Sequence, residues 1–130
     1  MSKRLLIVDD SPEILDMLKL TFKVWCPECH VVLATNGLEA LTQMKLQERV
    51  QPFDIVLTDY DMPLMNGIDL AQEIRQLWPN THIVLMSGDY FDKKHIHADA
   101  YPVKFDGFIE KPFVMRQVKR LFLTDPGILQ

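Results

Sequence analysis

Three carboxylates, a hydroxyl and an ammonium group stand at the ends of short apolar runs in this sequence. They are Asp9, Asp10, Asp59, Ser87 and Lys111. A short apolar run bounded by turn residues is typical of a buried strand that ends at the surface. Ligands of open parallel sheets bind outside the carboxyl ends of the strands. We therefore expect these five side chains to gather along one edge of a sheet.

Such a cluster favours phosphoryl transfer to an aspartate. Asp9, Asp10 and Asp59 would repel one another and raise one another's pKa unless a cation lies between them. Mg²⁺ prefers oxygen ligands, typically takes one or two carboxylates and retains waters, which leaves a position for a phosphoryl oxygen. An aspartate can act as the nucleophile, while Lys111 pairs with one phosphoryl oxygen and Ser87 binds another.

The elements that position these groups alternate along the chain. Short apolar runs predict strands at residues 4–8, 30–34, 53–58, 82–86 and 107–110. Apolar residues at helical spacing predict helices that begin near Pro12, Gly37, Gly67 and Pro112, with a further short helix over residues 92–100. Strands that alternate with helices imply right-handed crossovers and a parallel sheet covered on both faces. The sequence thus predicts a doubly wound α/β fold.

Composition narrows the class of protein. At 130 residues, with 48% hydrophobic and 25% charged residues, the chain is typical of a single globular domain. No apolar run approaches the roughly 20 residues that a bilayer crossing needs, and the first apolar stretch stops at Val8, so we expect no membrane insertion, no signal peptide and a cytoplasmic protein. The net charge of −4 argues against direct nucleic-acid binding.

Cys26, Cys29 and His30 form a C-x-x-C-H motif, which fits haem attachment, redox chemistry or zinc binding. Haem attachment needs an export signal, and structural zinc usually takes four protein ligands, of which this stretch offers at most three. We therefore expect two reduced thiols in a loop of a cytosolic protein.

Taken together, the motifs resemble the receiver domain of two-component response regulators, and in particular its stand-alone, chemotaxis-type members. The residues that carry the resemblance are Asp9-Asp10, Asp59, Asp61-Met62-Pro63, Ser87-Gly88 and Lys111-Pro112. It covers nearly the whole chain and implies a five-stranded parallel sheet of flavodoxin-like order 2-1-3-4-5. It also implies a receiver domain over residues 1–124, followed by a tail over residues 125–130.

The resemblance assigns a role to each residue of the cluster. Asp59 would be the phosphoacceptor, Asp10 and Asp59 would bind Mg²⁺ directly, and Asp9 would act through a bound water. Asp61 would give its backbone carbonyl to the metal, and Lys111 would bind the phosphate. Ser87 would be the switch hydroxyl, and Phe108 the aromatic that changes rotamer and reshapes the surface of the fourth helix, fifth strand and fifth helix.

The function predicted in this way is that of a phosphoacceptor in a histidine-to-aspartate relay. The domain would catalyse phosphorylation of its own Asp59 and slow hydrolysis of the product, without turnover of an external substrate. Its partners would be a sensor histidine kinase or phosphotransfer protein and a downstream effector protein, and it would be a monomer or weak dimer.

The resemblance also implies a cis peptide bond between Lys111 and Pro112. Residues 101–105 depart from the family's usual Gly-Ala turn, so the output face could be reshaped.

Two alternatives remain open. Asp59-Tyr60-Asp61 is similar to the D-x-D start of haloacid-dehalogenase-type phosphatases, although Pro63 stands where Thr or Val is expected and the chain leaves little room for a cap domain. The other alternative is a degenerate receiver that serves only as a protein-binding scaffold.

Overall fold

The computed structural model describes residues 3–88, 102–111, 116 and 118–119. Eight helices and strands have their bounds within these residues, in the order β1 (Arg4–Val8), α1 (Pro12–Trp25), β2 (His30–Ala34), α2 (Gly37–Gln47), β3 (Ile55–Asp59), α3 (Gly67–Leu77), β4 (His82–Ser87) and β5 (Gly107–Glu110). None of the helices in this described part has the length and apolar character needed to cross a bilayer.

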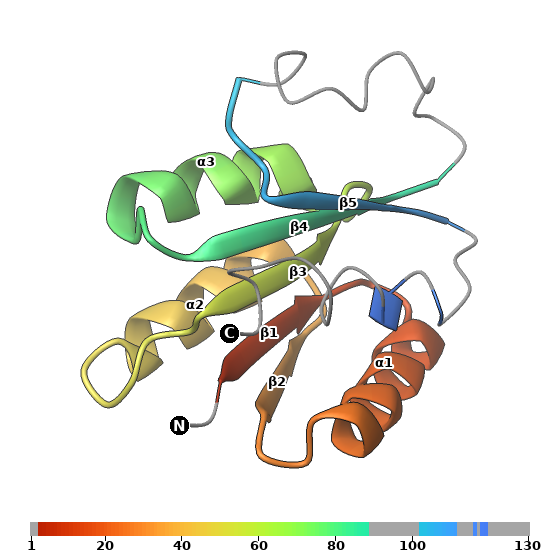
Figure 1. Ribbon diagram of the computed structural model, residues 1–130. Helices are drawn as coiled ribbons and strands as arrows, with labels where there is room; N and C mark the ends of the chain where they lie inside the picture. The colour runs from red at the N-terminus through yellow and green to blue at the C-terminus, as the bar shows by residue number, and fades with distance from the viewer. Residues whose placement is uncertain (1–2, 89–101, 112–115, 117, 120–130) are drawn as a thin grey trace.

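The strands form one parallel sheet in the order β2-β1-β3-β4-β5 (Figure 1). The predicted strand order is confirmed, with boundaries that move by one or two residues: β3 begins at Ile55 and β4 extends to Ser87. The central strand β3 is buried at all five positions, as expected for a strand with helices on both sides. All five strands end at the same edge.

Alternation along the strands divides the core into two layers. In β1, Leu6 and Val8 pack in the cluster that contains α2 and α3 side chains, whereas Leu5 and Ile7 pack in the cluster that contains α1 side chains. Figure 1 shows α1 on one face of the sheet and α2 and α3 on the other. The predicted doubly wound arrangement is therefore confirmed.

Polar caps fix where the helices begin. The Ser11 hydroxyl accepts a hydrogen bond from the Ile14 N–H at 3.4 Å, and Pro12 occupies the first helical position, as predicted. Asn36 caps α2 and Asn66 caps α3 through their side-chain carbonyl oxygens. Ser11 and Asn36 begin their helices soon after β1 and β2 end, whereas Asn66 closes the longer loop between β3 and α3.

Several predicted features lie outside the described residues, namely the short helix over 92–100, the cis peptide bond at Lys111–Pro112 and most of the helix from Pro112. Within that last helix, residues 116, 118 and 119 are described as helical. Val118 is fully buried in the cluster on the α1 face of the sheet.

The prediction of two reduced thiols is wrong, because Cys26 and Cys29 are joined in a disulfide. The Cys29 N–H donates to the Cys26 carbonyl at 2.9 Å, which closes a turn. This turn holds the two Cα atoms 5.2 Å apart, inside the usual range for a disulfide. In this state the sulfurs are bonded to each other and cannot serve as thiolate ligands for zinc.

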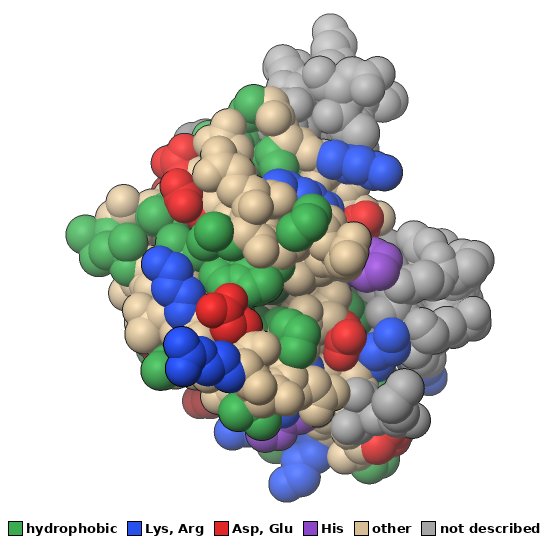
Figure 2. Space-filling view, turned by 90° about the vertical axis from the view of Figure 1, so that its left-hand side faces the viewer, with side chains coloured by type: hydrophobic (Ala, Val, Ile, Leu, Met, Phe, Trp, Pro, Cys, Tyr) green, Lys and Arg blue, Asp and Glu red, His purple; other side chains and the backbone are tan. Residues whose placement is uncertain are grey.

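Charge is mixed on the face seen in Figure 2, where acidic and basic side chains of the described residues are interspersed.

A cavity of about 380 Å³ lies at the amino-terminal edge of the sheet, with Phe53, Trp78 and His82 in its lining. Because the carboxylates follow the opposite ends of the strands, this cavity is separate from the cluster described next.

Candidate functional site

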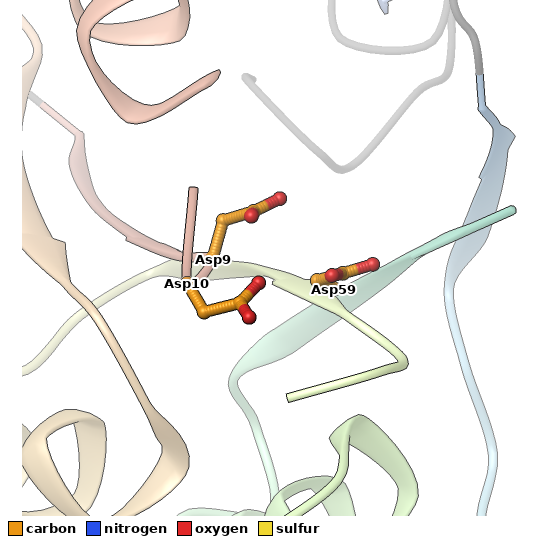
Figure 3. Close-up of side chains that lie close together, drawn as sticks. All are labelled: Asp9, Asp10 and Asp59. Carbon is orange, nitrogen blue, oxygen red and sulfur yellow. The ribbon is translucent and has the colours of Figure 1, made fainter. Parts of the chain in front are cut away.

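Adjacent strands bring the predicted carboxylates together. Val8 pairs with Thr58 across β1 and β3, so the residues that follow them, Asp9 just after β1 and Asp59 at the end of β3, lie side by side. Asp10 follows at the start of the loop to α1. One oxygen from each of Asp9, Asp10 and Asp59 lies within 4.8 Å of the others, and Figure 3 shows the three side chains at the ends of β1 and β3.

Lys111 supplies the opposing positive charge. Its Nζ atom lies 2.7 Å from Asp9 Oδ2 and 3.2 Å from Asp59 Oδ1. The backbone places it there, because the Lys111 N–H donates to the Ser87 carbonyl at 2.5 Å directly after the β4–β5 pairing. The ammonium group therefore bridges two of the three carboxylates predicted to bind metal.

Asp9 is held in place from two sides. It is fully buried, its Oδ2 accepts from Lys111, and its Oδ1 accepts from the Ser11 N–H at 2.9 Å. A buried carboxylate requires such partners, since an unpaired charge in the interior is costly. The Ser11 N–H contact was not predicted from the sequence, although the Asp-Asp-Ser-Pro turn is the signal that could have indicated it.

Burial sets the protonation of Asp59. Removal from water raises its pKa from 3.8 to about 6; Lys111 opposes this increase, while Asp9 and Asp10 add to it. For Lys111, burial alone would lower the pKa, but its hydrogen bond to Asp9 and the negative charge of Asp59 prevail and raise it above 10.5. Near neutral pH the site thus holds an ionised Asp59 beside a charged Lys111.

A glycine allows the β3–α3 loop to fold against Asp59. The Gly67 N–H donates to the Tyr60 carbonyl at 2.8 Å, and a Cβ atom at Gly67 would overlap the backbone carbonyl oxygen of Asp59. Asn66-Gly67 was predicted only as the start of a helix, and the contact of Gly67 with Asp59 was not predicted. The signal was present, because an Asn-Gly pair indicates a tight turn.

The remaining predicted residues lie around this cluster. Ser87, the last residue of β4, is 6% exposed, and it pairs with Glu110 beside Lys111. Phe108 is half-buried in β5, with its ring centroid 5.5 Å from that of Phe105. Asp61 is exposed in the β3–α3 loop, and its side chain is not among the clustered carboxylates.

This arrangement can perform two kinds of chemistry. Oxygen ligands from several carboxylates, one of them with a pKa raised in part by its acidic neighbours, suit a hard divalent cation such as Mg²⁺. A carboxylate at the end of a rigid central strand, beside a lysine, also suits attack on an electrophilic phosphorus atom. Both kinds of chemistry belong to phosphoryl transfer.

Comparison with known proteins identifies the family. The family model of the response regulator receiver domain matches residues 5–122, most of the chain. The chain belongs to this family. Receiver domains act in two-component signalling, where phosphorylation on aspartate and Mg²⁺ binding at an acidic pocket are standard.

Individual relatives differ in how much of their length this receiver domain spans. This receiver domain is 37% identical over 115 residues to the chemotaxis protein CheY of Thermotoga maritima. The aligned region covers 87% of this chain and 88% of CheY. It is 30% identical over 122 residues to the autoinducer 1 sensor kinase/phosphatase LuxN of Vibrio campbellii. This second aligned region covers 92% of this chain but only 13% of LuxN.

Among solved structures, a receiver domain protein from Clostridium thermocellum superposes with a TM-score of 0.77 at 23% identity, covering 92% of this chain and 90% of that one. This likeness supports the fold.

Proposed function

We propose that this receiver domain accepts a phosphoryl group on Asp59 from a phosphohistidine of a sensor histidine kinase or a phosphotransfer protein. The observation that carries the proposal is the position of Asp59: it ends the central strand, is 6% exposed and lies 3.2 Å from the Lys111 ammonium group. It is also the member of the cluster whose pKa burial raises to about 6, so its carboxylate is available as a nucleophile above that pH.

The acidic cluster fits Mg²⁺. Asp10 and Asp59 would bind the ion directly, Asp9 would act through a water and Asp61 would contribute its backbone carbonyl. When bound, the ion would neutralise the carboxylates and the developing charge on the phosphoryl oxygens. Lys111 already neutralises part of the charge on Asp9 and Asp59, which leaves the exposed Asp10 as the carboxylate most in need of a cation.

In the reaction, a carboxylate oxygen of Asp59 attacks phosphorus as the bond from phosphorus to the donor nitrogen breaks, and the departing imidazole takes a proton. Lys111 pairs with a phosphoryl oxygen and stabilises its charge. Hydrolysis reverses the modification when water attacks phosphorus, which releases inorganic phosphate and restores Asp59. The residue is consumed and regenerated within one signalling cycle.

The switch would begin at Ser87. A new phosphoryl oxygen on Asp59 attracts the Ser87 hydroxyl, and Phe108 on the neighbouring strand fills the space that this hydroxyl leaves. Leu85 of β4 pairs with Phe108 of β5, two residues before Ser87 pairs with Glu110, so the two groups lie close along the same strand pair. The surface formed by the predicted helix over residues 92–100, by β5 and by the predicted helix from Pro112 would then bind a downstream effector protein.

We also propose that residues 1–124 form the receiver unit, with residues 125–130 as a tail, and that the domain is a monomer or weak dimer. The phosphatase alternative is not favoured, because the receiver family match extends over residues 5–122. A degenerate receiver that serves only as a scaffold would gain no phosphoryl group, and the mass measurement described below tests this.

Incubation with acetyl phosphate and Mg²⁺, followed by intact mass spectrometry, tests the proposal. The parent protein should gain one phosphoryl group, and Asp59→Asn should gain none, whereas Asp69→Asn, a surface control on α3, should behave as the parent. A parent protein that stays unmodified, or an Asp59→Asn variant that is modified equally, would count against phosphorylation at Asp59.

A further inference from the structure

The loop between α1 and β2 carries chemistry that the phosphoacceptor site does not use. It holds the disulfide between Cys26 and Cys29 at the amino-terminal edge of the sheet, the edge opposite the carboxylates. The Cys26 side chain is largely buried, with the residue 9% exposed, whereas Cys29 is half-buried and more accessible.

Backbone hydrogen bonds hold this loop in place independently of the sulfur atoms. The Cys26 N–H caps α1 by donating to the Phe22 carbonyl at 2.8 Å, and the Cys29 N–H donates to the Cys26 carbonyl at 2.9 Å. The His30 N–H then donates to the Lys3 carbonyl at 2.8 Å, which ties the loop to the chain just before β1. Pro27 stands at the second position of the turn, where its fixed φ is favourable.

These contacts preorganise the two cysteines. Because none of the hydrogen bonds involves sulfur, the same turn can keep the Cα atoms near their separation of 5.2 Å after the disulfide is broken. A folded dithiol held in this way forms its disulfide more readily than the same four residues in an unfolded chain.

We propose that Cys26 and Cys29 form a reversible thiol–disulfide couple, an exchange site for dithiol reductants. A thiolate of the reductant attacks Sγ of Cys29, the more exposed of the two residues, and Cys26 leaves as a thiolate that takes a proton. The second thiol of the reductant attacks the resulting mixed disulfide and releases Cys29. The protein gains two electrons and two protons, and the reductant becomes a disulfide.

The couple adjoins a contact between α1 and the last helix. Trp25, the residue before Cys26, packs edge-on against Phe22 with ring centroids 5.7 Å apart, and Lys119 Nζ lies 6.0 Å from the centre of the Trp25 ring. A change at the end of α1 therefore reaches an aromatic side chain that contacts the segment after β5. Trp25 also provides an optical signal of the redox state.

The test is an equilibrium titration in dithiothreitol redox buffers, with acid quenching, alkylation and intact mass, on folded protein and on protein unfolded in urea. Closure of a four-residue loop predicts a disulfide equilibrium constant about 20-fold larger in the folded state. Disulfide formation and folding are linked in one thermodynamic cycle, so breaking the disulfide should destabilise the fold by the same factor. Reduced dithiothreitol should therefore raise the unfolding equilibrium constant of the parent about 20-fold and leave that of Cys29→Ser unchanged. In a Trp78→Phe background, Trp25 emission should follow the same titration.

Two results would overturn the proposal. One is a folded protein whose cysteines stay alkylatable in excess oxidised dithiothreitol or whose disulfide does not exchange with the reduced form. The other is an unfolding equilibrium that reductant changes equally in the parent and in Cys29→Ser.

Discussion

Replacement of Asp59 by Asn should stabilise the fold, and the size of this effect should depend on pH. Each pKa unit corresponds to about 1.4 kcal/mol, so a rise from 3.8 to about 6 means that ionised Asp59 costs the folded state roughly 3 kcal/mol. Between these two values the folded protein binds a proton that the unfolded chain has released. The free energy of unfolding of the parent therefore falls as pH rises through this window and levels off above pH 6.

Asn cannot ionise, so the variant lacks this loss of stability. In buffer free of divalent ions, urea unfolding followed by circular dichroism should show Asp59→Asn more stable than the parent by about 1 kcal/mol at pH 4.5 and about 3 kcal/mol at pH 7.5. Asp16→Asn, at an exposed position of α1, should give nearly the same small difference at both pH values. An advantage for Asp59→Asn that is absent, or equal at both pH values, would refute the electrostatic reasoning.

The remaining predictions concern the metal, the lysine and the loop after β3. Mg²⁺ at 100 times its dissociation constant at pH 7.5 should add about 2.7 kcal/mol to the unfolding free energy at that pH. The same Mg²⁺ concentration should add much less at pH 4.5, where Asp59 is protonated, and an equal gain at both pH values would contradict this. Lys111→Ala should leave phosphorylation possible, move its pH midpoint above that of the parent and uncouple it from effector binding, measured by intact mass and pulldown. Gly67→Ala should cost about 2 kcal/mol in urea unfolding, whereas Gly88→Ala, with no atom within 4 Å of its added Cβ, should change stability by less than about 1 kcal/mol. Leu64→Asn should add about 0.5 kcal/mol by thermal unfolding, because exposed Leu64 has a φ of 72° that Asn tolerates better.

The sequence was most informative where strands end. The switch from a buried apolar run to Asp9, and from another to Asp59, predicted both strand ends, because buried parallel strands have few polar residues until they leave the core. The alternation of strands and helices predicted the parallel sheet. The order of its strands came from the family resemblance, since alternation alone is compatible with several orders.

Contacts made by flexible or loop residues were less accessible from the sequence. Lys111 lies closer to Asp9, at 2.7 Å, than to Asp59, at 3.2 Å, and a side chain with four rotatable methylene groups gives no such preference in advance. The Cys26–Cys29 disulfide depends on how close the α1–β2 turn brings two Cα atoms, which residue types alone do not determine. The expectation of free thiols was based on a cytosolic protein without the context for haem or zinc binding, and not on the geometry of this turn.

The acceptor residue itself can be identified by chemical trapping. Protein treated with acetyl phosphate and Mg²⁺ is reduced with borohydride, which converts an aspartyl phosphate to homoserine, and the modified peptide is sequenced by mass spectrometry. The structure predicts homoserine at position 59. Among the clustered carboxylates, Asp59 is the one that ends the central strand, and it contacts Lys111 and lies beside Asp9 and Asp10, which follow β1. Homoserine at position 9, 10 or 61 in place of 59, or no homoserine at all, would contradict this account.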